Sequence, residues 1–217
     1  MFSGGIERKF SQHDSMNSSR PALFFDRDGT LMQEVDHCHR TEDVHAIEGA
    51  VALLEKTHAQ GWLHLIITNQ SGIGRSYFTK TEFEAVQDEL QRQLNGLIDG
   101  VYMSPDIPGT NSTRRKPAPG MILEAAEKFN VDLARSFMIG DRTSDIEAGR
   151  AAGCRTILVL TGYGKEHRDC SADFIAEDVT EALKWILSLT PQASSDISCR
   201  STAVAGKLDE YIGRLPL

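Results

Sequence analysis

The chain has 217 residues, of which 40% are hydrophobic and 25% are charged. At about 150 residues per domain this length favours one globular domain, and the composition excludes a disordered or fibrous chain. Because 31 acidic residues outnumber 23 Lys and Arg to give a net charge of −8, with no long basic run, we expect no binding to nucleic acid.

The cysteines and the apolar runs indicate the compartment. None of the cysteines forms a C-x-x-C pair, and four in a chain of this length are not typical of a disulfide framework: Cys38, Cys154, Cys170 and Cys199. Residues 1–19 lack the apolar stretch of a signal peptide, and no run reaches the roughly 18 apolar residues that a membrane span needs. We therefore expect a cytoplasmic protein with no membrane partner.

Short apolar runs that predict buried strands alternate along the chain with segments of helical periodicity. In chain order the sequence predicts a strand at 22–25, a helix around Val51 and Leu54, a strand at 63–67, a helix from Phe83 to Leu97, a weaker strand at 100–103, a helix from Ile122 to Phe129, strands at 136–139 and 156–160, a weaker strand at 172–175 and a helix from Ala182 to Ile186. This alternation predicts a parallel α/β sheet with right-handed crossovers. The segments between the strands are too short to hold a large cap domain.

The predicted domain covers residues 20–190, between two tails. We expect residues 1–19 to be a flexible N-terminal tail and residues 191–217 to be a C-terminal tail. The stretch 191–206 is rich in Ser, Ala and small polar residues, which is typical of a linker. Beyond it, apolar residues at helical spacing indicate a short helix: Leu208, Tyr211, Ile212 and Leu215.

Polar residues follow the predicted strands at their carboxyl ends. They are Asp26 and Asp28 after the first strand, Thr68 and Asn69 after the second, and Asp141 and Asp145 after the strand at 136–139. Ligands of parallel α/β sheets bind outside the carboxyl ends of the strands, so these side chains should meet, together with the basic segment 114–116. Carboxylates, a hydroxyl and a lysine in one crevice suit phosphoryl chemistry with Mg²⁺.

Four motifs in order along the chain resemble those of the haloacid dehalogenase (HAD) superfamily. They read Phe25-Asp26-Arg27-Asp28-Gly29-Thr30-Leu31, Thr68-Asn69-Gln70, Arg115-Lys116-Pro117 and Gly140-Asp141-Arg142-x-x-Asp145. The longer stretches 69–75 and 116–121 are similar to the capless branch that holds heptose-bisphosphate and histidinol-phosphate phosphatases. The resemblance spans about residues 22–163 and implies a Rossmann-like three-layer α/β/α fold with no large cap domain.

The resemblance also implies a role for each motif residue in Mg²⁺-dependent phosphomonoester hydrolysis. Asp26 would be the nucleophile that forms an aspartyl-phosphate, and Asp28 would be the general acid and then the general base. Thr68 and Lys116 would hold the phosphate oxygens. The implied Mg²⁺ ligands are Asp26, the backbone carbonyl of Asp28, and Asp141, with Asp145 supporting them from one layer further out. One such Asp alone would be ordinary turn or helix-cap chemistry, but four ordered motifs favour catalysis.

Further residues are predicted to contact the substrate: Glu34, Asp36, His37, Asn69, Gln70, Arg115 and Arg142. The first expected substrate is a small sugar phosphate, D-glycero-D-manno-heptose 1,7-bisphosphate, which would lose its 7-phosphate. Histidinol phosphate is the second candidate, and a nucleic-acid 3′-phosphate is disfavoured by the net charge. A non-catalytic binding protein on the same fold would lack an essential motif residue, and none is missing. We expect a monomer or a weak homodimer.

One loop departs from the family pattern. Many relatives carry a C-x-H…C-x-C zinc loop before the Arg-Lys-Pro motif, where this chain has Ser104, Asp106, Ser112 and Arg114. A structural zinc site needs thiolate or imidazole donors, so we expect no structural zinc. The segment 37–39, His-Cys-His, is spaced too tightly for a zinc tetrahedron and is predicted to be a loop.

Overall fold

The computed structural model describes residues 19–189. Of these, residues 19–187 belong to one compact unit, and Ser188 and Leu189 belong to a second. The predicted C-terminal tail, with its linker and its helix around 208–215, lies outside the described residues, as does all of the predicted N-terminal tail except Ser19.

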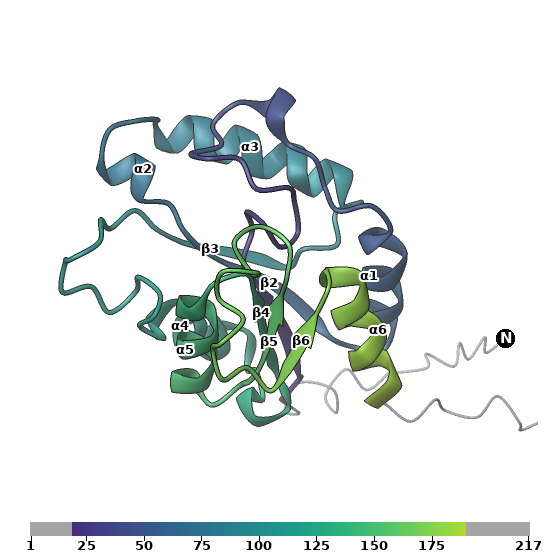
Figure 1. Cartoon of the computed structure of the whole chain (residues 1–217). Helices are drawn as coiled ribbons and strands as arrows, with labels where there is room; N and C mark the ends of the chain where they lie inside the picture. The colour runs from purple at the N-terminus through teal and green to yellow at the C-terminus, as the bar shows by residue number, and fades with distance from the viewer. Residues whose placement is uncertain (1–18, 190–217) are drawn as a thin grey trace, which may run out of the picture. The chain divides into compact units, whose positions relative to one another are not determined.

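A six-stranded, fully parallel sheet runs through the first unit in the order β3-β2-β1-β4-β5-β6 (Figure 1). Its strands are β1 (Ala22–Phe25), β2 (Leu63–Asn69), β3 (Gly100–Ser104), β4 (Phe137–Gly140), β5 (Arg155–Val159) and β6 (Phe174–Ala176). The helices are α1 (Ala50–Ala59), α2 (Ser71–Gly74), α3 (Lys80–Gln93), α4 (Gly120–Phe129), α5 (Thr143–Ala152) and α6 (Val179–Leu189), with short 3-10 turns η1 (Thr41–Asp43) and η2 (Leu133–Arg135). The predicted alternation of strands and helices is confirmed.

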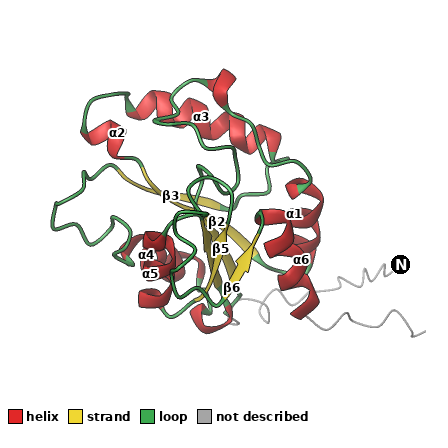
Figure 2. Ribbon diagram, in the orientation of Figure 1, coloured by secondary structure: helices red, strands yellow, loops and turns green. Residues whose placement is uncertain are grey.

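The two faces of the sheet bury two separate apolar clusters, because successive side chains of a strand point to opposite faces. In β1, Leu23 and Phe25 join a cluster with residues of α1, α3 and α6. The alternate residues Ala22 and Phe24 join a second cluster with α4 and α5. Helices therefore cover both faces, as Figure 2 shows, and the fold is a three-layer α/β/α sandwich. All four residues of β1 are buried, which explains its continuous apolar sequence.

Helix α3 differs from its prediction at the C-terminal end. It begins with a capping box, in which Thr79 accepts from the backbone N–H of Glu82 while the Glu82 carboxylate accepts from that of Thr79. It ends at Gln93 because Asn95 takes a left-handed conformation, with φ 53°. The prediction that Leu97 continues this helix is wrong: Leu97 packs against the same core from beyond the helix end.

Two strand ends also differ from the sequence prediction. Strand β2 continues through Thr68 and Asn69, since these residues pair with Met103 and Ser104 of β3. Strand β4 begins at Phe137 rather than Ser136. The Ser136 hydroxyl instead donates to the Asp132 carbonyl and accepts from the Ala22 N–H. Polar side chains therefore shift a strand boundary that apolar runs alone do not define.

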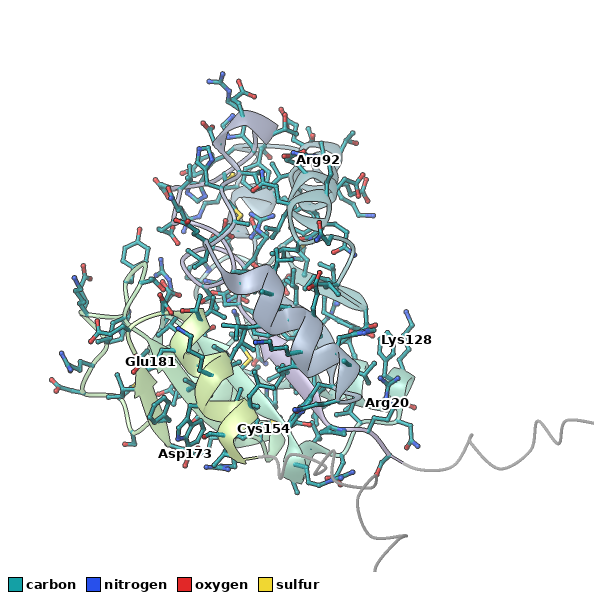
Figure 3. All side chains as sticks on the ribbon, turned by 90° about the vertical axis from the view of Figure 1, so that its right-hand side faces the viewer. Arg20, Arg92, Lys128, Cys154, Asp173 and Glu181 are labelled. Carbon is teal, nitrogen blue, oxygen red and sulfur yellow. The ribbon has the colours of Figure 1, made fainter. Side chains whose placement is uncertain are left out.

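The helices carry charged side chains on their solvent-exposed faces, for example Arg92 on α3, Lys128 on α4 and Glu181 on α6 (Figure 3). Within residues 19–189, the loops that leave the carboxyl edge of the sheet contain only the short elements η1 and α2 in addition to helix α3. This part of the chain therefore contains no large cap domain. None of the described helices has both the length and the apolar character to cross a bilayer. Cys38 and Cys154 are buried free thiols.

Leu54 provides a test of the packing around α1, because its side chain is fully buried whereas Leu123 on α4 is 44% exposed. We expect Leu54→Ala to lower the free energy of unfolding by about 2–5 kcal/mol, since it leaves a cavity in the core. The control Leu123→Ala should cost less than about 1 kcal/mol. Urea denaturation measures both. Equal losses for the two variants would contradict this assignment of the core.

Candidate active site

Loops at the carboxyl edge of the sheet enclose a pocket of about 650 Å³. Twelve of the predicted site residues line it: Asp26, Asp28, Glu34, Asp36, His37, Thr68, Asn69, Gln70, Arg115, Lys116, Arg142 and Asp145. The remaining one, Asp141, is fully buried and is not part of the pocket wall. The strand order explains this convergence, since β1 is paired with both β2 and β4.

Lys116 is a buried cation held between two carboxylates. Its ammonium nitrogen lies 2.9 Å from Asp26 Oδ1 and 2.7 Å from Asp145 Oδ1, and it donates to the Ile67 carbonyl at 2.7 Å. Burial lowers the pKa of Lys116, but the charges of Asp145 and Asp26 and their hydrogen bonds outweigh burial and leave the pKa raised. The side chain is therefore charged at neutral pH.

Asp26, Asp141 and Asp145 form an acidic group in which one carboxylate oxygen of each lies within 4.8 Å of the others. Burial, followed by the charges of Asp26 and Asp145, raises the pKa of Asp141 to about 8. Its Oδ2 accepts from the Tyr163 N–H at 2.8 Å, while Oδ1 has no hydrogen-bond partner among the described residues. Three closely spaced carboxylates, one of which has an oxygen without a hydrogen-bond partner, fit a divalent cation such as Mg²⁺.

Gly29 allows the loop after β1 to approach Asp141. Its φ is +75°, and a Cβ atom at this position would lie 2.5 Å from Asp141 Oδ2. The Thr161 hydroxyl donates to the Gly29 carbonyl at 2.6 Å and so ties this turn to the loop after β5. A side chain at position 29 would displace Asp141, which is why the turn requires glycine.

The Asp28 carboxylate is held by three donors from two side chains. Arg27 donates from Nε to Oδ2 at 3.0 Å and from Nη2 to Oδ1 at 3.1 Å, and Gln70 donates to Oδ2 at 2.9 Å. Arg27 is fully buried, with its guanidinium carbon 5.0 Å from the centre of the Phe83 ring. Arg27 was not predicted as a site residue. The available signal was a charged residue two positions after an apolar strand, between two motif aspartates.

The amides of Asn69 and Gln70 are used inside the protein. Asn69 accepts from the N–H of Lys116 and donates to its carbonyl, both at 3.0 Å. Gln70 donates to Asp28 and, at 2.8 Å, to the Thr68 hydroxyl. Asn69 therefore positions Lys116, and Gln70 positions Asp28 and Thr68. Their predicted contact with substrate stays a prediction.

The outer wall of the pocket combines cations, a carboxyl and an imidazole. The Arg142 guanidinium lies 3.8 Å from the centre of the Tyr163 ring, which fixes its orientation. Burial, and then the charge of Asp28, raises the pKa of Glu34 to about 7. The His37 ring packs edge-on against Tyr77 at 4.9 Å between centroids. Tyr163 and Tyr77 were not predicted as site residues.

The loop that departs from the zinc pattern is held together by hydrogen bonds. Asp106 Oδ2 accepts from the hydroxyls of Ser104 and Ser112, at 2.9 and 2.6 Å. Arg114 pairs with Glu124 on α4, with 2.9 Å between Nε and Oε1.

Residues 113–182 match the family model described as HAD-hydrolase-like.

Relatives and solved structures similar to this chain have consistent names. D-glycero-D-manno-heptose-1,7-bisphosphate 7-phosphatase of Thermosynechococcus vestitus is 38% identical over 187 residues, which are 77% of this chain and 95% of the relative. D-glycero-beta-D-manno-heptose-1,7-bisphosphate 7-phosphatase of Helicobacter pylori is 40% identical over 67% of this chain and 86% of the relative. The crystal structure of D,D-heptose 1,7-bisphosphate phosphatase from B. bronchiseptica, complexed with magnesium and phosphate, has a TM-score of 0.72 at 28% identity and covers 78% of this chain and 99% of that one.

The three-layer fold and the motif side chains gathered at one edge of its sheet define a phosphatase of the HAD superfamily. Identities of 38% and 40% extend over 95% and 86% of the two relatives. The chain therefore belongs to the family of heptose-1,7-bisphosphate 7-phosphatases.

The raised pKa of Asp141 predicts a pH-dependent response to Mg²⁺. The pKa is about 8 in the folded chain, whereas an aspartate in an unfolded chain has a pKa of about 3.8. The folded protein then binds more protons than the unfolded chain between these pH values, so this group contributes a loss of stability as pH rises from about 4 to about 8. A Mg²⁺ ion bound here would displace the proton and relieve the repulsion, so the increase in Tm on adding Mg²⁺ should be larger at about pH 8 than at about pH 6.

Thermal denaturation of wild type and Asp141→Asn, with and without Mg²⁺ at both pH values, measures this effect. The variant has no carboxylate to ionise at this position and should show a smaller pH dependence in its response to Mg²⁺ than the wild type. An increase in Tm that is equal at both pH values in the wild type would contradict the prediction.

Proposed function

We propose that this phosphatase is Mg²⁺-dependent and removes the 7-phosphate of D-glycero-D-manno-heptose 1,7-bisphosphate through an aspartyl-phosphate on Asp26. The observation that carries the proposal is the buried Lys116 ammonium between Asp26 and Asp145 at the wall of the pocket. A cation fixed beside a candidate nucleophile is suited to the charge that spreads over phosphate oxygens in the transition state.

Asp26 would attack phosphorus with Oδ2. Its Oδ1 accepts from the Lys116 ammonium and, at 2.7 Å, from the N–H of Arg27. Two donors on one oxygen fix the carboxylate plane and leave the other oxygen for bond formation. Attack on phosphorus then breaks the bond to the leaving oxygen.

Asp28 would give a proton to that leaving oxygen and later take one from the water that hydrolyses the aspartyl-phosphate. The hydrogen bonds from Arg27 and Gln70 hold its carboxylate in place. This orientation would allow the same group to serve both steps.

Thr68 and Lys116 would stabilise the phosphate in different ways. The Thr68 hydroxyl oxygen accepts from Gln70, so its proton is available for a phosphate oxygen. Lys116 has three N–H donors and three acceptors, at Asp26, Asp145 and Ile67. Its contribution would therefore come mainly from its positive charge.

Mg²⁺ would be held by Asp26, the backbone carbonyl of Asp28 and Asp141, and when bound it would neutralise charge and orient the phosphate. Asp145 would support this site without binding the ion directly. One of its oxygens pairs with Lys116, and the other accepts from the Arg142 N–H at 2.9 Å. The unsatisfied Oδ1 of Asp141 supports the assignment of Asp141 as a ligand.

The substrate is proposed from the names of the relatives and from the shape and charge of the pocket. A volume of about 650 Å³ suits a small sugar bisphosphate. Arg115 and Arg142 would bind the end that carries the second phosphate. Glu34, Asp36 and His37 would contact sugar hydroxyls. We propose a cytoplasmic monomer or weak homodimer, and histidinol phosphate is the alternative substrate.

Release of phosphate from the heptose bisphosphate tests the proposed function. We expect Mg²⁺-dependent turnover, and Asp26→Asn should lower it at least about 1,000-fold because the amide cannot act as the nucleophile. The matched control Asp88→Asn, at an exposed position on α3, should retain wild-type activity. Full activity in excess EDTA, or more than about a tenth of the activity in Asp26→Asn, would refute the mechanism. Faster hydrolysis of histidinol phosphate would refute only the substrate.

The absence of soft ligands in the loop at 104–114 predicts that folding needs no zinc. Protein purified without a metal-affinity tag should contain much less than one zinc per chain, and chelators should leave its Tm unchanged. Elemental analysis after dialysis checks this. Stoichiometric zinc that Asp106→Ala removes would overturn the prediction.

A further inference from the structure

The connection from β3 to α4 brings Arg115 and Lys116 to the pocket, and Asp106 lies at the centre of its hydrogen bonds. Asp106 Oδ2 accepts from the Ser104 hydroxyl at 2.9 Å and from the Ser112 hydroxyl at 2.6 Å. The Asp106 N–H donates back to Ser104 Oγ at 3.3 Å. We refer to Ser104, Asp106 and Ser112 as the Asp106 cluster.

The direction of each hydrogen bond in the Asp106 cluster follows from the number of protons available. A serine hydroxyl has one proton, which Ser104 and Ser112 both give to the carboxylate. Ser112 Oγ then accepts from the N–H groups of Arg114 and Arg115, at 3.1 and 3.0 Å. These bonds from Ser112 and Ser104 lower the pKa of Asp106, so the carboxylate is ionised at neutral pH.

The Asp106 cluster contacts Arg115 at both ends of the residue. Ser112 accepts from its backbone N–H, and the Asp106 carbonyl accepts from its Nη1 at 2.8 Å. Hydrogen bonds at the backbone N–H and at the far end of the side chain restrict the rotamers of Arg115 and so reduce the entropy lost on binding a ligand. The guanidinium keeps further N–H donors for a ligand in the pocket that Arg115 lines.

The cluster is anchored to rigid parts of the fold. Ser104 is buried at the end of β3 and lies in register with Asn69 of β2, and its carbonyl accepts from the Gln70 N–H at 2.7 Å. Gly74 approaches the same loop so closely that a Cβ atom would lie 2.3 Å from the Pro105 carbonyl oxygen. Asp106 therefore connects Arg115 to the sheet edge that carries the motif residues.

Electrostatics favours the same arrangement. Burial, and then the nearby Arg75, lowers the pKa of Arg115, and Arg142 acts in the same direction. The charge of Asp106 opposes both arginines. The Asp106 charge thus partly offsets the repulsion that Arg115 experiences from Arg75 and Arg142.

We infer that Asp106 is a positioning residue that orients the Arg115 guanidinium toward the anionic end of the substrate remote from the reacting phosphate. This inference rests on the proposed function, because it takes the pocket as the substrate site. Asp106 touches no reacting atom in this scheme. Its effect reaches the substrate through Arg115.

Kinetics with two substrates tests the inference. The heptose bisphosphate has a second phosphate to reach Arg115, whereas p-nitrophenyl phosphate carries only the reacting one. Asp106→Asn keeps the backbone carbonyl that binds Arg115 Nη1 but removes the charge of the carboxylate to which Ser104 and Ser112 donate, and so weakens the support of the loop. It should raise KM for the bisphosphate about 10-fold or more and change kcat less than about 2-fold. Its kcat/KM for p-nitrophenyl phosphate should stay within about 2-fold of wild type.

Two further variants separate positioning from general damage to the loop. Ser112→Ala keeps the carboxylate but removes the acceptor for the Arg115 N–H, so it should raise the same KM. Thr113→Ala, one position away and exposed, is the matched control and should behave as wild type. In the Arg115→Ala background, Asp106→Asn should produce no further rise in KM, because residues that act through one another are not additive.

An unchanged KM in Asp106→Asn, additive effects with Arg115→Ala, or an equal loss with p-nitrophenyl phosphate would each overturn the inference. Failure of the proposed substrate would be visible separately, as hydrolysis of p-nitrophenyl phosphate but not of the heptose bisphosphate by the wild type. The bisphosphorylated metabolite that the wild type does hydrolyse then replaces it in the same comparison.

Discussion

The ion pairs of Lys116 are the interaction on which the site depends. Burying an ammonium group and two carboxylates costs hydration energy, which only close pairing and additional hydrogen bonds offset. The ammonium reaches Asp26 after β1, Ile67 in β2 and Asp145 in α5, so it connects three elements of the sandwich. Loss of Lys116 would leave two buried carboxylates without their counter-ion, and the position of Asp26 and the stability of the fold are therefore coupled.

The sheet order makes this connection possible. Strand β1 lies between β2 and β4, so the loops after three neighbouring strands open at one edge. Lys116 comes from a later loop, beyond the edge strand β3, and Asn69 binds its peptide group at both N–H and carbonyl. Backbone recognition of this kind places the lysine without using its charged end, which remains for the carboxylates.

The sequence was sufficient to predict the strands and the convergence of the motif residues at one edge of the sheet, because strands buried on both faces are continuous apolar runs and parallel strands bring their carboxyl ends together. It was not sufficient for the end of α3, where Leu97 continues the apolar spacing although the backbone has already turned at Asn95. The partners of Gln70 and the part played by Arg27 also escaped prediction. Residue type states what a side chain can donate or accept, but only three-dimensional geometry states to which atom.

Arg27 lies beneath the ring of Phe83 on α3 and holds Asp28 with two nitrogens. One guanidinium thus contacts the apolar interior and a carboxylate of the pocket at the same time. Substitutions in α3 chosen to improve packing around Phe83 would change the ring surface that the Arg27 guanidinium contacts. They would therefore affect the pocket, although α3 contributes none of the residues that line it. Engineering this helix for heat resistance and tuning the enzyme's turnover are, at this position, a single design problem.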